Sequence, residues 1–312
     1  MATLPPPDEA RFKRIAKQAT ADLVRNALSL PNLKLLSRVQ HKATSRHAVI
    51  YGGHDSTDPS LPMVGAHTFL RSSLTDLADL FQLNTPAKLD AYGATLGSRI
   101  TAKQTLFSLT STEHPAATSS ASSAPHCEIS WFAYNPPLPG MSKRDYCVLE
   151  SHTDIEVLDQ SNHVRRGWVR CLHSIDDVAW VSRPDRASFM MFTKDWLGRR
   201  LMNMYFTWDR TGLVCIETDT PGLLEVYYVL VPVLTGAAWN VSTKRMAKRQ
   251  VEKILRLEQF LSYQHLDYGR AISASVVSVK NTTKCCARCT KTFHWLRTKR
   301  QCHRCLDVSS PE

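Results

Sequence analysis

The sequence lacks a long apolar run. Its longest apolar stretch, residues 223–234, carries Glu225 and is shorter than the roughly 20 residues that a membrane-spanning helix needs. The N-terminal residues, MATLPPPDEARF, also lack the apolar segment of a secretory signal. Hydrophobic residues make up 43% of the 312 residues and charged residues 21%, which is typical of soluble globular proteins. We therefore expect a soluble chain with a substantial core.

Catalytic signatures are missing as well. The sequence contains no G-x-S-x-G, G-x-x-x-x-G-K-S/T, G-x-G-x-x-G or H-E-x-x-H motif. His152 lies two residues before Asp154, and His173 lies shortly before Asp176 and Asp177. Such short-range pairs are typical of strand ends and turns. The sequence therefore predicts a protein that is not an enzyme.

The nine cysteines are unevenly distributed. Five of them lie between residues 285 and 305, and the other four lie singly within apolar stretches. Isolated cysteines in such surroundings behave as small buried hydrophobic residues and indicate a reducing, intracellular compartment. The four single cysteines are Cys127, Cys147, Cys171 and Cys215.

The net charge of +11 is concentrated near the C-terminus. Residues 1–239 carry 24 Lys and Arg against 23 Asp and Glu, whereas residues 240–312 carry 15 against 5. A localised positive field fits a polyanionic partner, either an anionic membrane surface or nucleic acid. A solvated basic helix face followed by a soluble tail is the alternative interpretation.

The pattern of apolar residues predicts an α+β fold. Residues 8–28 carry an apolar stripe at helical spacing, short helices are expected at 74–83 and 86–92, and a long helix is expected at about 242–264. Strands are predicted at residues 39–51, 63–70, 127–134, 145–152, 163–173, 188–194, 201–208, 212–218 and 225–234. A curved antiparallel sheet closed by one long helix commonly encloses a cavity.

The order of these elements resembles the START lipid-transfer domain over residues 8–266. Three segments add to the resemblance: KRDYCVLE at residues 143–150, GWVRCLHSI at 167–175, and YVLVPV at 228–233 before the long helix. The resemblance implies a START-like curved sheet whose cavity holds an apolar lipid ligand.

Large side chains of the predicted strands are the candidates for lining this cavity. They are Trp131, Tyr134, Phe189, Met191, Tyr205, Trp208 and Tyr228. Three polar residues, Arg144, Asp145 and His173, are candidates for orienting a headgroup. Our leading candidates are Trp131, Arg144, Tyr205 and Tyr228. An ordinary core position is the alternative for each.

The segment at residues 284–305, KCCARCTKTFHWLRTKRQCHRC, contains two Cys-x-x-Cys pairs separated by twelve residues. The pairs are Cys286 with Cys289 and Cys302 with Cys305. This spacing is the usual way to hold one Zn²⁺ with four thiolates, and a site filled in this way leaves no open position for catalysis. Because so short a segment has almost no core, metal binding would fold it.

The cysteine-rich segment resembles the first half of a FYVE domain, the zinc module that docks on phosphatidylinositol 3-phosphate. The spacing Cys286-x2-Cys289-x3-Phe293-x8-Cys302-x2-Cys305 is similar to that of the family. Some proteins of water moulds have a START-like domain followed by a FYVE-like finger, and this chain resembles those proteins. The density of basic residues beside the second cysteine pair makes Lys299, Arg300, His303 and Arg304 the candidates for contacting an anionic headgroup, and a merely soluble basic loop is the alternative.

The segment also departs from the FYVE pattern. The family's basic signature falls on residues 298–303 without its two histidines, and its glycine is replaced by Leu306. The Trp-x-x-Asp element is absent, and only two of the four ligand pairs are present before the sequence ends. Three interpretations stay open: a single zinc in a rearranged ribbon, a truncated copy of a two-zinc module, or unligated cysteines.

Taken together, the sequence predicts three parts. Residues 1–268 form a START-like lipid-binding domain, 269–284 a linker and 285–312 an incomplete FYVE-like finger with one Zn²⁺. We expect a cytoplasmic protein, peripheral on endosomal membranes, whose partners are a lipid and an anionic membrane surface. The alternative is a nucleic-acid or protein interaction module on a START-like scaffold that has lost lipid binding; a gel shift in low salt distinguishes the two.

Overall fold

In the computed structural model the chain forms two compact units, Met1–Glu258 and Gln259–Glu312. The structure describes residues 4–41, 46–96, 100–109, 126–134, 144–159, 161–175, 206–234, 241–257, 261, 300–301 and 308–309.

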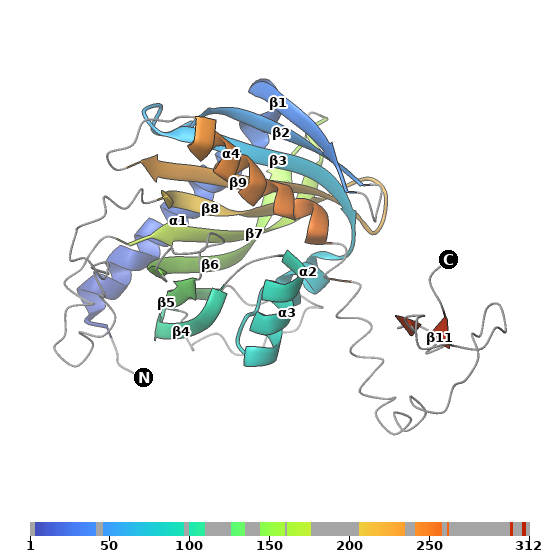
Figure 1. Cartoon of the computed structure of the whole chain (residues 1–312). Coiled ribbons are helices and arrows are strands. Elements are labelled where there is room, and N and C mark those ends of the chain that lie inside the picture. The colour runs from blue at the N-terminus through green and yellow to red at the C-terminus, as the bar shows by residue number, and fades with distance from the viewer. Residues whose placement is uncertain are drawn as a thin grey trace. The chain divides into compact units, whose positions relative to one another are not determined.

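The first unit is built on one antiparallel sheet of nine strands (Figure 1). Its strand order is β1-β2-β3-β9-β8-β7-β6-β5-β4, so the first three strands join the rest through the pairing of β3 with β9. Valine, isoleucine, threonine and aromatic residues, which favour pleated and half-buried surfaces, dominate the central strands. The strands are β1 Lys34–Gln40, β2 His47–His54, β3 Pro62–Arg71, β4 Ile100–Ser108, β5 His126–Tyr134, β6 Arg144–Leu158, β7 Val164–Ser174, β8 Phe206–Glu217 and β9 Leu223–Leu234.

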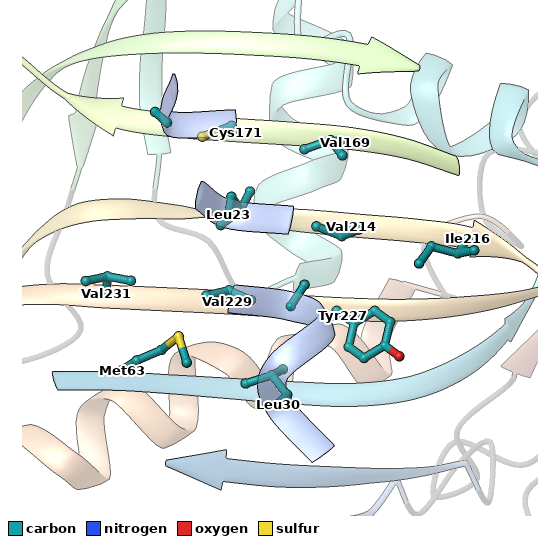
Figure 2. Packing of buried hydrophobic residues seen from close by; sticks show 12 residues of the cluster. Leu23, Leu30, Met63, Val169, Cys171, Val214, Ile216, Tyr227, Val229 and Val231 are labelled. Carbon is teal, nitrogen blue, oxygen red and sulfur yellow. The ribbon is translucent and has the colours of Figure 1, made fainter. Parts of the chain in front are cut away.

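Helix α1, Pro6–Ser29, packs along one face of the sheet and contacts β6, β7, β8 and β9. Pro6 stands at its first position and acidic residues occupy the first turn, both of which favour a helix start. A 3-10 turn, η1 Leu30–Asn32, follows it. Figure 2 shows Leu23 over β8 beside Val214 and Leu30 over β3, within a layer of buried side chains that includes valines of β7, β8 and β9. This buried layer of aliphatic side chains is the main core.

Two glycines allow α1 to lie close to the sheet. A Cβ atom at Gly212 would lie 2.0 Å from the backbone oxygen of Arg170 and 2.7 Å from Leu23 Cδ2. One at Gly65 would lie 2.4 Å from the methyl groups of Leu30. Leu23 of α1 and Leu30 of η1 therefore occupy the space that side chains at these two strand positions would fill.

A buried ionic cluster fixes α1 to the sheet at a second place. Arg210 of β8 binds Asp22 of α1 at 2.7 Å and also pairs with Asp55, which follows β2. Asn26 of α1 donates to the Asp55 carboxylate at 3.2 Å. Burial opposes the ionised form of Asp55, but hydrogen bonds from Thr57 and Arg210 outweigh it and lower its pKa to about 2.

The opposite face of the sheet carries the remaining helices of this unit: α2 Leu74–Leu80, α3 Pro86–Leu96, α4 Val241–Val251 and the 3-10 helix η4 Glu252–Arg256. Figure 1 shows α4 in front of β3 and β9 and α1 behind the sheet. A capping box between Ser73 and Asp76 starts α2. None of the helices in the described ranges is long and apolar enough to cross a membrane.

The α+β prediction agrees with these elements. The helix predicted at 8–28 and the strands predicted at 63–70, 127–134, 163–173 and 225–234 each have a counterpart within two residues at either end. The strand predicted at 145–152 continues to Leu158. The strand predicted at 188–194 lies outside the described residues.

Three predictions about elements were wrong or incomplete. Residues 39–51 are not one strand, because β1 ends at Gln40 and a hydrogen bond from His41 N to Arg46 O closes a hairpin into β2. The described part of the strand predicted at 201–208, which is residues 206–208, and the strand predicted at 212–218 belong to one strand, β8, which continues through a bulge between Trp208 and Arg210. Strand β4 was not predicted at all.

The long C-terminal helix is described only in part. An α-helix covers Val241–Val251 and a 3-10 helix covers Glu252–Arg256, and their buried residues include Ala247, Val251 and Ile254 of the predicted stripe. Residues 258–260 and 262–299 lie outside the described ranges. The continuation of this helix to residue 264 therefore stays a prediction.

In the second unit the structure describes one short strand pair. Strand β10, Arg300–Gln301, pairs antiparallel with β11, Val308–Ser309, in the register Arg300 to Ser309 and Gln301 to Val308. This pairing brackets residues 302–307, which contain the second predicted cysteine pair. The predicted linker, 269–284, lies outside the described residues.

Candidate functional site

Four adjacent strands carry charged side chains on the sheet face opposite α1. Alternation along a strand sends neighbouring residues to opposite faces. Ile129 and Leu149 thus pack with Phe12 of α1, whereas Glu128 and Glu150 point to the other side. We call the following set the buried network: Lys103 and Thr105 of β4, His126, Glu128 and Ser130 of β5, Glu150 and His152 of β6, and Arg170 of β7.

Glu150 lies at the centre of the buried network, and its side chain has no exposed surface. Arg170 Nε and one terminal nitrogen of the same guanidinium each lie 2.8 Å from Glu150 Oε1. Lys103 Nζ donates to Oε2 at 2.8 Å, and His152 Nε2 lies 2.9 Å from Oε1. A carboxylate this deeply buried requires several donors of this kind to remain ionised.

Glu128 forms the second half of the buried network. Lys103 Nζ also lies 2.8 Å from Glu128 Oε1, so one ammonium group bridges the two carboxylates. The hydroxyls of Ser130 and Thr105 donate to Glu128 at 2.5 and 2.8 Å, and His126 Nε2 lies 3.1 Å from Oε2. Both oxygens of the carboxylate therefore have two partners.

The charges of the buried network compensate one another. Burial raises the pKa of Glu128, but the hydrogen bond from His126 and the charge of Lys103 outweigh it and lower the pKa to about 2. Burial acts in the same way on Glu150, where Arg170 and Lys103 hold the pKa well below its ordinary range. Near neutral pH two carboxylates thus face two permanent cations, and the core of the network is neutral.

The two histidines of the buried network have opposite pKa shifts. The hydrogen bond to Glu128 raises the pKa of His126, whose side chain is 43% exposed. Burial lowers the pKa of His152, which is 6% exposed, although Glu150 acts against the shift. The register pairs these residues across β5 and β6, and their ring centroids lie 5.6 Å apart. His152 is therefore neutral near pH 7 and donates through Nε2.

Aromatic side chains cover the Arg170 end of the network. Phe81, which follows α2, stacks on Trp168 with ring centroids 5.9 Å apart, and Arg170 Cζ lies 5.0 Å from the Phe81 centroid. Tyr92 of α3 hydrogen-bonds to Arg170, and burial raises its pKa to about 12. Packing of a guanidinium against aromatic faces is favourable when water is excluded.

One buried donor beside the network is unsatisfied. Trp168 is fully buried, and its ring meets His152 edge to face at a centroid distance of 5.4 Å. Within the described part of the chain, its Nε1–H group has no hydrogen-bond partner. A buried orphan donor costs about 1–3 kcal/mol, so a water molecule or an acceptor from a ligand is expected at this group.

The face carrying the network continues to β9 and α4. Tyr228 of β9 accepts a hydrogen bond from Thr211 Oγ1 of β8 at 3.4 Å and one from Gln250 Nε2 of α4 at 3.4 Å. Tyr228 thus joins the sheet to the helix that crosses it. Tyr228 is one of the leading candidates for lining the predicted cavity, and it lies on the sheet face opposite α1, where a lining residue is required.

Of the other leading lining candidates, the structure describes only the side chain of Trp131. The register of β5 places Trp131 on the α1 face, opposite Cys147, because it follows the network residue Ser130 and shares the face of Ile129. Arg144 is the first residue of β6 and pairs with Tyr134, but its side chain is not among those described. Tyr205 lies outside the described residues.

The predicted metal and headgroup residues lie largely outside the described residues. These are Cys286, Cys289, Cys302, Cys305, Lys299, His303 and Arg304. Only the backbone of Arg300 is described, as part of β10. The described residues, which do not include the four cysteines, contain no group of three or more metal-ligating side chains. The zinc site therefore stays a prediction.

The residues that the sequence analysis missed have a recognisable signal. Glu128, Glu150 and Arg170 each stand inside a strand with apolar neighbours, in HCEISWF, CVLESH and GWVRCL. A charged residue in the interior of an apolar strand marks either an edge position or a buried partner. Lys103 gave no such signal, because its strand was not predicted.

This arrangement suits binding of a polar group within apolar surroundings. It offers fixed donors and acceptors, no net charge at its core, and aromatic walls. A ligand with a large net charge would disturb the compensation between the two carboxylates and the two cations. A hydroxyl, carbonyl or zwitterionic group would not.

Comparison with known proteins identifies the fold. No family model and no curated protein matches the sequence. Among solved structures, human StAR-related lipid transfer protein 5 superimposes with a TM-score of 0.51 at 8% identity, over 82% of this chain and 99% of that one. The STAR-related lipid transfer protein from Xanthomonas axonopodis matches with a TM-score of 0.40 at 10% identity, over 72% and 98%.

The likeness to the human protein confirms the START-like part of the predicted fold. At this level of identity it shows the fold alone. The FYVE-type resemblance and the relation to water-mould proteins have no counterpart among these matches and stay predictions.

Proposed function

We propose that the first unit is a lipid carrier that holds one lipid on the sheet face opposite α1, with its polar end at the buried network. The buried network is the single observation that carries this proposal. A structural core has no need of Lys103, Glu128, Glu150 and Arg170 together, since an apolar core of the same volume is often as stable. Binding of a lipid headgroup does require fixed donors and acceptors in an apolar setting.

Two further observations support the proposal. The START-like fold is the fold of proteins whose names describe lipid transfer, which is support by analogy. The unsatisfied Trp168 Nε1–H group offers a donor to a lipid oxygen next to the network. In this proposal the protein binds and carries its ligand without catalysing a reaction.

Lipid loading tests this function. The full chain is incubated with mixed vesicles containing phospholipids, sterols and other neutral lipids, reisolated, and analysed for bound lipid by mass spectrometry. We expect one lipid class to be retained in stoichiometric amount. Glu150→Gln should reduce its retention, because it removes the acceptor that orients Arg170 and Lys103. Glu156→Gln is the matched control, an exposed glutamate on the same strand.

Loss of retention counts only if the variant remains folded, so circular dichroism melting is measured for both variants. A wild-type protein that retains no lipid from any mixture would refute the proposal. Equal retention by the Glu150→Gln variant would refute the role of the network.

We further propose that the second unit binds one Zn²⁺ through Cys286, Cys289, Cys302 and Cys305. Four thiolates in two Cys-x-x-Cys pairs are a donor set that fits tetrahedral zinc. Elemental analysis of the purified chain should give one zinc per molecule, and Cys302→Ser should abolish it. Cys285→Ser is the control, because the two-residue spacing belongs to Cys286. Two zincs or none would contradict the single-site proposal.

The remaining part of the proposal is that the protein is cytoplasmic and that this finger docks on phosphatidylinositol 3-phosphate at endosomal membranes. It predicts that vesicles containing this lipid bind the chain more tightly than vesicles with equal charge from another acidic lipid. Lys299→Ala with Arg300→Ala should remove the difference. Equal binding to all acidic vesicles would refute the specific interaction.

A further inference from the structure

Helices α4 and η4 separate apolar and cationic residues onto opposite sides. Ala247, Val251, Ile254 and Leu255 are buried against the sheet, and the two helices contact β3 and β9. Between them, at spacings of three and four, lie cationic residues on the side of the helices away from the sheet. We call four of them the cation stripe: Arg245, Arg249 and Arg256, which are exposed, and Lys248, which is half-buried.

The cation stripe has little compensating charge. Arg245, Arg249 and Arg256 are exposed, and no ion pair with any of them occurs among the described residues. Among the described residues, the stripe has one carboxylate pairing, Lys248 with Glu252 at 4.0 Å. Lys253 lies next to the stripe, and burial, followed by the charge of Arg256, lowers its pKa to about 8.

A row of unpaired cations destabilises the helix that carries it. Like charges four residues apart, such as Arg245 and Arg249, repel each other by about 0.2–0.5 kcal/mol per pair. Other cations of this unit pair with acids, as Lys13 does with Glu9 at 2.6 Å and Lys88 with Asp79 at 2.9 Å. An anionic partner would remove the repulsion in the stripe.

We propose that the cation stripe of α4 and η4 docks the first unit on anionic phospholipid membranes, independently of the cysteine-rich segment. This inference rests on the proposed function, because a lipid carrier must visit a membrane to load. It also follows from the position of α4, whose Gln250 contacts Tyr228 on the ligand side of the sheet at 3.4 Å. The stripe thus brings the helix that covers the ligand-binding face onto the lipid surface.

Vesicle flotation with the full chain tests the proposal. The vesicles are pure phosphatidylcholine, or phosphatidylcholine with phosphatidylserine. The variant is Arg245→Gln with Arg249→Gln, and the matched control is Arg14→Gln with Lys17→Gln, two exposed cations of α1 on the other side of the sheet. Both variants remove two positive charges. The α4 variant should fold at least as well as the wild type, because it removes a like-charge pair.

We expect the wild type to bind the anionic vesicles and not the neutral ones. The α4 variant should bind the anionic vesicles roughly 25-fold more weakly, since each cation near such a surface contributes about fivefold. The α1 control should bind like the wild type, and salt should weaken binding of all three proteins.

Three results would overturn the proposal. The first is equal binding of the α4 variant and the wild type to anionic vesicles. The second is equal binding of the wild type to neutral and anionic vesicles. The third is an α4 variant that loses binding to single-stranded RNA or DNA but keeps its binding to vesicles. The lipid-loading assay is run in parallel on the same preparations. A protein that retains a lipid but does not bind anionic vesicles refutes only the docking proposal. A protein that binds anionic vesicles but retains no lipid refutes only the carrier function.

Discussion

Replacing Arg170 by methionine is the most informative perturbation of the buried network. Arg170 contributes two of the donors within 2.9 Å of Glu150, whose side chain has no exposed surface. Breaking a buried pair by removing one partner costs about 3–5 kcal/mol, because the other charge stays buried. Lys103 and His152 keep part of the compensation, so we expect a loss near 3 kcal/mol. Urea unfolding followed by circular dichroism measures it.

Two controls define what this loss means. Arg166→Met removes an exposed arginine from the same strand and should cost less than about 1 kcal/mol. Arg170→Met combined with Glu150→Gln removes both partners, and it should recover most of the stability lost by the single change, because no uncompensated charge remains. If Arg170→Met costs no more than Arg166→Met, or if the double variant loses the sum of the single losses, the reasoning is wrong.

The pH dependence of this loss gives an independent check. In the wild type the Glu150 pKa lies well below its unfolded value, so its contribution to stability is present above about pH 4.5 and is lost as the pH falls. Without Arg170, the cations that lower the pKa of Glu150 compensate less of the effect of burial, so the pKa of Glu150 in the folded protein rises. The difference in stability between wild type and variant should therefore shrink below about pH 4.5.

Two other predictions concern acid stability and packing against α1. Glu128 and Asp55 both have pKa values of about 2, below their unfolded values, so each stabilises the folded state by about 2–3 kcal/mol near neutral pH. This stabilisation should disappear between about pH 4.5 and 2. Acid titration of the unfolding free energy should show the loss, and a flat profile would contradict it. Gly212→Ala should destabilise by more than about 2 kcal/mol, because its methyl group would meet the backbone oxygen of Arg170. Gly53→Ala, where the nearest atoms belong to the flexible side chain of Leu33 at 3.0 Å, should cost clearly less, and equal melting temperatures of the two variants would count against this account.

The sequence predicted the elements whose pattern is set by local burial. The helix at 8–28 was found because one side of it packs on the sheet along its whole length, which produces the 3.6-residue spacing. Strands β3, β5, β7 and β9 were found for the same reason, since each has apolar residues bounded by turn residues. The START-like order of elements could be inferred from these alone.

Strand β4 was missed because its pattern comes from long-range partners. Its sequence, ITAKQTLFS, alternates weakly, and Lys103, Gln104 and Thr105 are polar. The strand exists because it pairs with β5 and because Lys103 and Thr105 reach Glu128 across that pairing. The predicted break between the strands at 201–208 and 212–218 was wrong for a related reason. A bulge between Trp208 and Arg210 allows the strand to continue, and Arg210 then pairs with the carboxylates of Asp22 and Asp55.

Long-range strand pairing also limited the prediction of the residues that contact a ligand. Aromatic residues such as Trp131 were chosen by type, but the face on which a residue lies depends on strand register, and a shift of one residue reverses it. The residues with the strongest claim to ligand contact were the charged ones within apolar strands. A charge in the interior of a strand is tolerated only with a partner, so Glu128, Glu150 and Arg170 each implied a partner on a neighbouring strand.

The two charged regions of the first unit differ in a way that fits two separate tasks. In the buried network, two carboxylates compensate two cations on the sheet face beneath the helices, so it can bind a polar group without attracting free ions. In the cation stripe, the three arginines are exposed and have no carboxylate partner among the described residues, so their field extends into solvent over about 10 Å at ordinary salt. Gln250 and Tyr228 connect the helix that carries the stripe to the face that carries the network. Neutralising the stripe should therefore change vesicle binding without changing which lipid is retained, and replacing Glu150 should do the reverse.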